Sequence, residues 1–293
     1  MRMQWMHLLL VSAVFNSVEI SIPQTKGIDS SLMRKAMAGD AQAQYHVGQA
    51  NIQAKTPDFR QAAMWYQKAA DQGLANAQYE LGVLFQSGKG VEQDFAKASA
   101  WYRKAADQGL AGAQLNLGLL FDHGDGVPQD DAKAAGWYRK AALQGLPEAQ
   151  YNLGTLYERG IGVPQDYAQA ADLYRKAADK GNASAQFNLA LLYDNGNGLP
   201  QDYAQAAAWY TKAAEQSMPR AQFNLGSMYA GGQGVAVNFA EAYFWLDLAA
   251  NAWSGARQQD AGSARDTVAT RLTPADLSDA QERAKKWLAE RQK

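Results

Sequence analysis

The sequence predicts an all-α protein: an α/α solenoid in which helix-turn-helix repeats stack as a right-handed superhelix and end in C-terminal capping helices. Tryptophan recurs at positions 65, 101, 137, 209 and 245, at intervals of 36, 36, 72 and 36 residues, and Leu173 stands in the skipped slot. An Ala-Gln pair recurs with the same period, at 77–78, 113–114, 149–150, 185–186 and 221–222. Such a fixed period indicates stacked repeats, because one helical pair cannot cover both of its apolar faces alone.

The first segment, residues 1–20, is predicted to be a signal peptide. Arg2 precedes an apolar stretch from Trp5 to Phe15, which is too short to span a bilayer as a helix. This layout favours a periplasmic or secreted protein with no integral membrane segment once the signal is removed. The alternative is a cytoplasmic protein whose N-terminus is frayed or wrongly assigned, and the lack of cysteine fits both compartments.

A short helix is expected within residues 29–40, where it would cap the N-terminal end of the solenoid. Its apolar face consists of Leu32, Met33, Ala36 and Met37, and Gly39 follows. A solenoid needs such a cap because its terminal repeats have no neighbour.

Six repeats are expected to follow, each made of a first helix (helix A) and a second helix (helix B). Apolar residues recur with helical spacing in both helices, as in Ala77, Leu81, Leu84 and Phe85 of one helix A and Ala98, Trp101, Tyr102, Ala105 and Ala106 of one helix B. The first copy is divergent, with a connecting loop two residues shorter. The predicted repeats are 41–72, 73–108, 109–144, 145–180, 181–216 and 217–252.

Capping residues mark the helix boundaries. A short oxygen-bearing side chain precedes each helix B, where it can accept the free backbone N–H groups of the first turn: Asp94, Asp130, Asp166, Asp202 and Asn238. Glycine follows helix B at 73, 109, 145 and 181, where a left-handed conformation is favourable, and Ser217 replaces it once. Pro147 and Pro219 fall at the predicted first position of helix A, which proline favours.

The segment from Ala149 to Gly181, AQYNLGTLYERGIGVPQDYAQAADLYRKAADKG, resembles the Sel-one-like repeat (SLR), a relative of the tetratricopeptide repeat. The resemblance extends in register from about residue 41 to residue 250. It implies a solenoid that acts as an adaptor for protein complexes, often at the bacterial envelope or in secreted factors. Some relatives are described as β-lactamases or penicillin binders, but those are cysteine-rich. This chain has no cysteine and no serine followed three residues later by lysine, so the resemblance does not imply that chemistry here.

Residues 253–293 are predicted to form a C-terminal helical cap. Thr273 and Asp276 have the spacing of a helix start in which a hydroxyl and an acid cap each other. The apolar face that follows consists of Leu277, Ala280, Ala284, Trp287 and Leu288. The tail from Glu241 onward also resembles the terminal segment that follows such repeats in many bacterial proteins.

Composition and motifs argue against several classes of function. The net charge of −1 and the pI near 6.3 lack the basic excess that nucleic-acid binding needs. The paired glycines at 88/90, 124/126, 160/162, 196/198 and 232/234 have no phosphate-binding frame and are predicted to be interhelix turns. The histidines at 7, 46 and 123 are isolated, so neither a metal nor a cofactor is expected. The Arg-Lys pairs at 103/104, 139/140 and 175/176 are predicted to lie on a solvated convex face.

A second stripe on each helix A, offset from the core face, is the candidate partner-binding surface. By the resemblance to tetratricopeptide repeats it should line a concave groove. Its residues are Tyr79, Val83, Gln86, Leu115, Leu119, Asp122, Tyr151, Thr155, Glu158, Phe187, Leu191, Asp194, Phe223 and Ser227. The alternative is that its regular aromatic residues only pack between successive helices. Its acidic members suggest a basic ligand. A neighbouring position holds Asn116, Asn152, Asn188 and Asn224, with Glu80 in the second copy, and we expect it to have a structural role.

The predicted function is therefore that of a non-enzymatic adaptor, expected to be a monomer, which binds a protein or peptide in its groove. An envelope enzyme acting on a β-lactam or peptidoglycan-like substrate is the first alternative, although the sequence shows no convergent nucleophile, base and orienting group. A structural spacer without a specific ligand is the second.

Overall fold

The computed structural model describes residues 28–291, and this part of the chain contains fifteen helices and no strand. The predicted signal peptide, residues 1–20, lies outside the described residues. The helices are α1 Ser30–Met37, α2 Ala41–Gln53, α3 Phe59–Asp71, α4 Ala75–Ser87, α5 Phe95–Asp107, α6 Ala111–His123, α7 Asp131–Leu143, α8 Pro147–Arg159, α9 Tyr167–Asp179, α10 Ala183–Asn195, α11 Tyr203–Glu215, α12 Pro219–Gly231, α13 Phe239–Ala252, α14 Ala256–Ala269 and α15 Pro274–Arg291.

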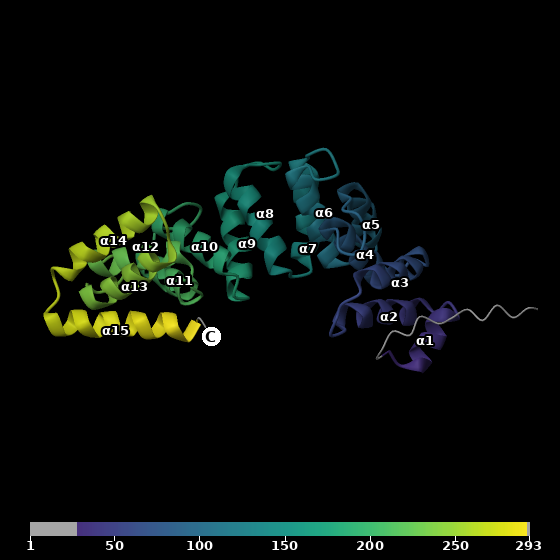
Figure 1. Ribbon diagram of the computed structural model, residues 1–293. Helices are drawn as coiled ribbons and strands as arrows, with labels where there is room; N and C mark the ends of the chain where they lie inside the picture. The colour runs from purple at the N-terminus through teal and green to yellow at the C-terminus, as the bar shows by residue number, and fades with distance from the viewer. Residues whose placement is uncertain (1–27, 292–293) are drawn as a thin grey trace, which may run out of the picture.

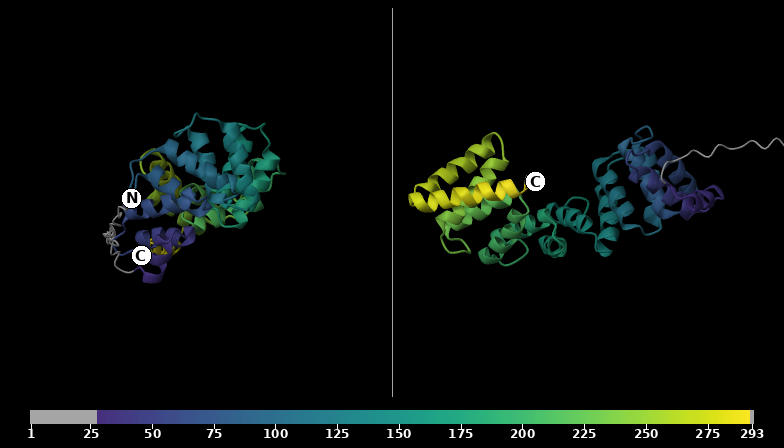
Figure 2. Two further views of the ribbon diagram at one scale, coloured as in Figure 1. Left: turned by 90° about the vertical axis from the view of Figure 1, so that its right-hand side faces the viewer. Right: turned by 60° about the horizontal axis from the view of Figure 1, so that its bottom comes forward.

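The helices follow one another in sequence order along a curved row, with α1 at one end and α14 and α15 at the other (Figure 1), and the right-hand view of Figure 2 shows the same order. Consecutive helices pack against each other from α1 through α14, and α15 packs on α13. We refer to α2–α3, α4–α5, α6–α7, α8–α9, α10–α11 and α12–α13 as copies one to six, the even-numbered helix of each copy being its helix A. The predicted all-helical repeat solenoid is confirmed.

The predicted capping residues act as expected. The carboxylate of Asp130 accepts a hydrogen bond from the backbone N–H of Lys133 at 2.9 Å, and the other residues that precede helix B make the same bond. Ser217, which replaces a C-terminal glycine, has a φ of 64°. Thr273 and Asp276 bond to each other through both side chain and backbone at the start of α15. Local capping therefore sets the helix boundaries that the sequence predicts.

Glycine is required where the interhelix loop of one copy meets the preceding copy. Gly126 has a φ of 67°, and a Cβ atom there would lie 2.3 Å from the backbone carbon of Phe95, the first residue of the previous helix B. The second glycine of the loop makes the equivalent close contact in copies two, four, five and six, at Gly90, Gly162, Gly198 and Gly234. The loop therefore joins neighbouring copies directly, which is why the paired glycines recur with the period of the repeat.

A ladder of glutamine side chains explains the recurrent Ala-Gln pair. In copy three, Gln114 Nε2 donates to the carbonyl oxygen of Ala106 at 3.1 Å, and Gln114 Oε1 accepts from Gln144 Nε2 at 2.9 Å. Gln114 is only 4% exposed, so these bonds satisfy an amide that burial would otherwise penalise. The ladder thus connects the end of one helix B to the next copy.

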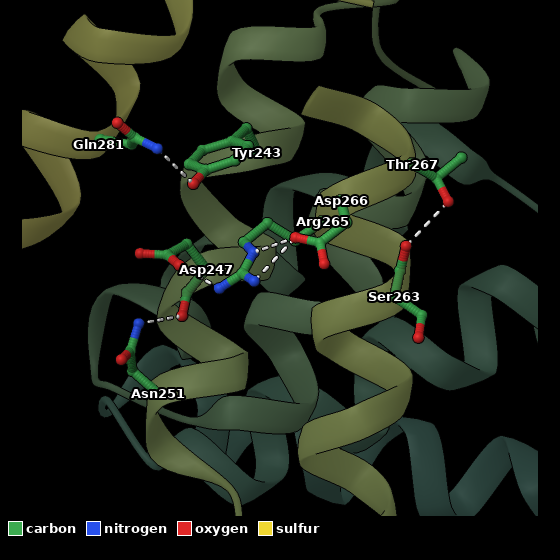
Figure 3. Close-up of polar contacts among 8 residues, drawn as sticks. All are labelled: Tyr243, Asp247, Asn251, Ser263, Arg265, Asp266, Thr267 and Gln281. Carbon is green, nitrogen blue, oxygen red and sulfur yellow. Dashed lines mark hydrogen bonds and ion pairs between the residues drawn. The ribbon is translucent and has the colours of Figure 1, made fainter. Parts of the chain in front are cut away.

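The two ends of the row are covered differently. At the N-terminal end, α1 packs on α2 and is capped by Asp29. At the C-terminal end, α14 packs on α13, and α15 runs back along the row until Arg291 donates to the carbonyl oxygen of Glu215 on α11 (Figure 1). Figure 3 shows how the tail is held: Arg265 on α14 bonds to Asp247 on α13 at 2.9 Å, and Gln281 on α15 donates to the Tyr243 hydroxyl at 3.2 Å.

Candidate partner-binding surface

The fourteen residues predicted to contact a partner lie on the helix A of copies two to six, on α4, α6, α8, α10 and α12. We call this set the A-helix stripe. Twelve of its members are partly exposed, Ser227 is exposed, and only Phe187 is buried, at 9% exposure. A partner can therefore reach most of the stripe without any change in the fold.

The aromatic residues of the stripe pack against buried aromatic rings of the B helices. The ring centroid of Tyr151 lies 5.9 Å from that of Tyr174, and the centroids of Phe187 and Tyr210 are 5.7 Å apart. Tyr79 also lies against Gly112 of the next helix A, where an added Cβ atom would be 3.4 Å from its ring. Packing between successive helices is thus one role of these rings, and it leaves part of Tyr79 and Tyr151 exposed.

The polar members of the stripe accept hydrogen bonds from these buried tyrosines. The Tyr138 hydroxyl, on a fully buried side chain, donates to Asp122 Oδ2 at 3.0 Å. Tyr102 donates to Gln86 at 2.6 Å, and Tyr174 donates to Glu158. Burial, the largest cause, raises the pKa of Tyr138 far above 10, and the negative charge of Asp122 raises the pKa further. Each hydroxyl therefore stays protonated and fixes the rotamer of the residue that would face a partner.

The asparagine position has the structural role that we expected, but its partner is a side chain. Asn188 Nδ2 donates to the Tyr174 hydroxyl at 3.1 Å, so this hydroxyl connects α8 and α10 through Glu158 and Asn188. In copy two, Glu80 occupies the position, and partial burial raises its pKa. The sequence could not identify this partner because the two bonded residues belong to different copies.

Two adjoining hollows open along the stripe. The larger, of about 300 Å³, lies between α8, α10, α12 and the segment after α13, and its lining includes Tyr151, Phe187, Asn188, Arg220 and Trp253. The smaller, of about 130 Å³, includes Asp122, Thr155 and Arg159 and shares Tyr151 with the first.

The structure thus brings Tyr151 and Phe187 of the stripe together at one hollow. Sequence reasoning missed Trp253, which follows the last repeat and whose ring centroid lies 5.7 Å from that of Phe223. The only signal for it was a tryptophan outside the repeat period.

The described residues offer little for other kinds of site. Among residues 28–291, no group of three or more histidine or acidic side chains is placed to hold a metal ion. Within the same range, no helix combines the length and the apolar character that crossing a bilayer requires.

Comparison with known proteins gives a consistent family. Six consecutive segments, 41–74, 75–110, 111–146, 147–182, 183–218 and 219–252, match the family described as Sel1 repeat. Each matched segment begins at the first residue of a helix A, whereas from the second copy on our predicted repeats begin two residues earlier. Repeats of this family generally form non-catalytic scaffolds that bind proteins. No curated protein matches the chain.

Two solved structures resemble this chain over most of its length. One is a protective antigen present in uropathogenic Escherichia coli strains and described as displaying an SLR fold, with 34% identity and a TM-score of 0.77 over 87% of this chain. The match covers only 56% of that antigen's chain. The other is a Sel1 repeat protein from Oxalobacter formigenes, with 32% identity and a TM-score of 0.71 over 83% of this chain and 99% of that one.

Proposed function

The chain belongs to the Sel1 repeat family, and from this premise we propose that it is a non-enzymatic adaptor whose A-helix stripe binds a protein or peptide. The observation that carries the proposal is the contrast between two layers of the same helices. The glutamine ladder and the buried tyrosines recur in nearly every copy, whereas the stripe beside them differs from copy to copy and is partly exposed. Residues that build every copy are constrained by neighbour contacts, so the variable layer is the one free to recognise a ligand.

The hollow at Tyr151, Phe187 and Trp253 is where the partner would place an apolar side chain. Aromatic residues dominate the energetics of protein interfaces because they bury much area for little conformational entropy. Asp122 and Arg159, which line the adjoining smaller hollow, supply side chains of both charges nearby. An extended peptide or a helix lying across successive A helices would meet this combination repeatedly.

The test is affinity capture with the full chain as bait. Extract proteins retained by the wild type are compared by mass spectrometry with those retained by a Tyr151→Ala plus Phe187→Ala variant. A second variant, Arg220→Glu plus Ser227→Lys, changes only exposed side chains and keeps the packed rings intact. Arg103→Ala, exposed on a helix B, is the matched control.

We expect both stripe variants to lose the same partner while the control retains it. Thermal unfolding of each variant tests whether the fold is preserved. A partner retained equally by both stripe variants would contradict the proposal, and equal tolerance along the whole stripe would favour a structural spacer.

We further propose that the protein is exported to the periplasm or secreted, and that it is monomeric. The support for export is the apolar stretch from Trp5 to Phe15, preceded by Arg2. Cell fractionation followed by N-terminal sequencing tests export, and light scattering tests the oligomeric state. An uncleaved chain in the cytoplasm would contradict the first proposal, and a mass twice that of one chain would contradict the second.

A further inference from the structure

The tryptophan of a typical helix B is covered by a lysine three residues later. The ammonium of Lys140 lies 3.8 Å from the centroid of the Trp137 ring, and Lys212 lies 3.7 Å from that of Trp209. The same pairing occurs at Trp65 and Trp101, at 4.4 and 3.8 Å. A cation over an indole face is a favourable arrangement, so this position of the repeat is built to hold an indole.

The surroundings of Trp137 show what the indole fills. Arg103, on the preceding helix B, lies 5.6 Å from the centroid of the Trp137 ring and also 5.6 Å from that of Phe121 on α6. Trp137 is consequently only 8% exposed, although it stands on the outer helix of its copy. The indole thus fills a recess between two B helices and the helix A between them.

One copy later the same recess is not filled. Leu173 replaces the tryptophan, and the space beside it is a pocket of about 400 Å³ between α7, α8 and α9. Its lining includes Arg139, Leu153, Tyr157 and Lys176, which correspond to Arg103, Leu117, Phe121 and Lys140 of the filled recess. The volume lies within the range of pockets that hold small ligands.

The rim of this pocket differs from the equivalent positions of other copies at two residues. Leu143 is 83% exposed and lines the rim, whereas the corresponding positions in the copies before and after are Asp107 and Asp179. Lys176 has no indole beneath it and instead pairs with Asp172 at 2.6 Å, a position that is Gly136 in copy three. The rim therefore has a large exposed apolar side chain beside a positioned ammonium group.

We propose that this pocket accepts the indole side chain of a tryptophan presented by a partner protein. The argument is one of internal equivalence, because the same frame holds an indole in the neighbouring copy. The incoming ring would lie against Leu153 and Tyr157, under the ammonium of Lys176, and Leu143 would cover its outer edge. Burial of the exposed Leu143 adds apolar area to the contact.

This site goes beyond the proposed adaptor function, because it shares no residue with the A-helix stripe, although Leu153 and Tyr157 of its lining belong to the helix A of copy four. A partner bound at the stripe and a partner bound at this pocket would contact different residues, even where both reach α8. The two proposals can therefore fail independently.

The test is a titration of the isotopically labelled full chain with N-acetyl-tryptophanamide, followed by NMR. We expect saturable shifts at the amides of Leu143, Leu173 and their neighbours, and none of comparable size with N-acetyl-leucinamide. The decisive variant is Leu173→Trp, which fills the pocket with the residue that the other copies carry. It should keep or raise the melting temperature and weaken binding at least tenfold.

Matched variants at the rim distinguish specific binding in the pocket from nonspecific binding to an exposed apolar side chain. Leu143→Asp restores the acid found in neighbouring copies and should weaken binding several-fold. Asp107→Leu places the same leucine beside the recess that Trp137 fills, and it should create no new site. New binding in Asp107→Leu would overturn the proposal, as would no saturable binding by the wild type or unchanged binding by Leu173→Trp.

A last arm distinguishes a protein partner from a free small molecule. The peptide acetyl-Gly-Gly-Trp-Gly-Gly-amide should bind the wild type at least as tightly as N-acetyl-tryptophanamide does, since the pocket is open at the protein surface. Binding of the small amide without binding of the peptide would overturn docking by a partner protein.

Discussion

Copies three and four are adjacent and share most of their frame, but helix B carries Trp137 in one and Leu173 in the other. In both, a buried tyrosine, Tyr138 or Tyr174, packs against the glycine of helix A and donates its hydroxyl to an acid. On the tryptophan side, Trp137 fills its recess whereas Leu173 leaves a pocket. The buried tyrosine of helix B connects successive A helices, so this side of helix B tolerates little change. The side that carries Trp137 or Leu173 faces outward, so a smaller residue there leaves a pocket while the copies remain stacked.

The largest expected effect comes from breaking the repeat itself. Deletion of residues 147–182 removes copy four as a unit, and Gly198 could then pack on Asp131 as Gly162 does now. We expect a helical protein that still unfolds cooperatively, because each copy contacts only its neighbours. Deletion of residues 147–164 removes α8 and the loop after it. Helix α9 is then left without its helix A, so cooperative unfolding should be lost.

Circular dichroism during urea denaturation measures both deletions. Equal damage from the two would refute the view that the helix pair is the unit of stability, and with it the comparison of one copy with the next.

The next effect contrasts the filled recess with the open one. Trp137→Ala should lower the free energy of unfolding by about 3–5 kcal/mol, the usual range for removal of a buried tryptophan. Leu173→Ala should cost roughly 1–2 kcal/mol, below the usual range for a buried leucine, because the side chain already borders an open pocket. Urea denaturation of both variants gives the difference. Similar losses would mean that Leu173 is packed as fully as Trp137.

The buried tyrosines should instead contribute equally to stability in both copies, and this contribution should be lost at alkaline pH. Burial raises the pKa values of Tyr138 and Tyr174 in the folded protein above the value of about 10 expected when unfolded. A raised folded-state pKa contributes stability that is complete below pH 10 and is lost as the pH rises above it. Tyr138→Phe should reduce the slope of stability against pH by about 1.4 kcal/mol per pH unit between pH 10 and 12.

Urea titrations at several pH values test this, with Tyr174→Phe as the matched variant in copy four. At neutral pH each variant should cost only about 1 kcal/mol for the lost hydrogen bond. An alkaline slope unchanged from that of the wild type would show that these hydroxyls ionise freely in the folded state.

The sequence predicts local structure well and contacts between copies poorly. The period, the capping residues and the glycine turns depend on neighbours in the chain, so Asp130 and Ser217 have the conformations that we expected. The bond from Tyr138 to Asp122 depends on how two helices cross, which periodicity does not specify. The same limit applies to burial, since Trp101 is partly exposed and Trp137 is buried at the same position of the repeat.

The candidate surfaces show the same division. Sequence alignment of the copies found the A-helix stripe and the skipped tryptophan at Leu173, because both are visible as departures from a period. Whether the space at Leu173 closes or stays open depends on the side chains of three helices, and only the structure shows the pocket. Trp253 lies outside the repeat period, so the period could not predict its contact with Phe223.

The smallest expected effect comes from restoring the glutamine ladder within copy four, where it joins copy three. Lys180 occupies the position that is Gln144 one copy earlier, and within residues 28–291 the buried Gln150 Oε1 has no hydrogen-bond partner. Lys180→Gln should donate to this oxygen as Gln144 donates to Gln114 and should stabilise the protein by about 1 kcal/mol. Providing a hydrogen-bond donor for a buried acceptor is worth about 1–3 kcal/mol. Loss of the favourable interaction between the Lys180 cation and the C-terminus of α9 costs roughly 0.3–1 kcal/mol, so the gain should exceed the cost. Urea denaturation measures this change in stability. Lys180→Ala is the control, because it removes the cation without restoring the hydrogen bond. Equal stability of the two variants would show that Gln150 gains nothing from the glutamine.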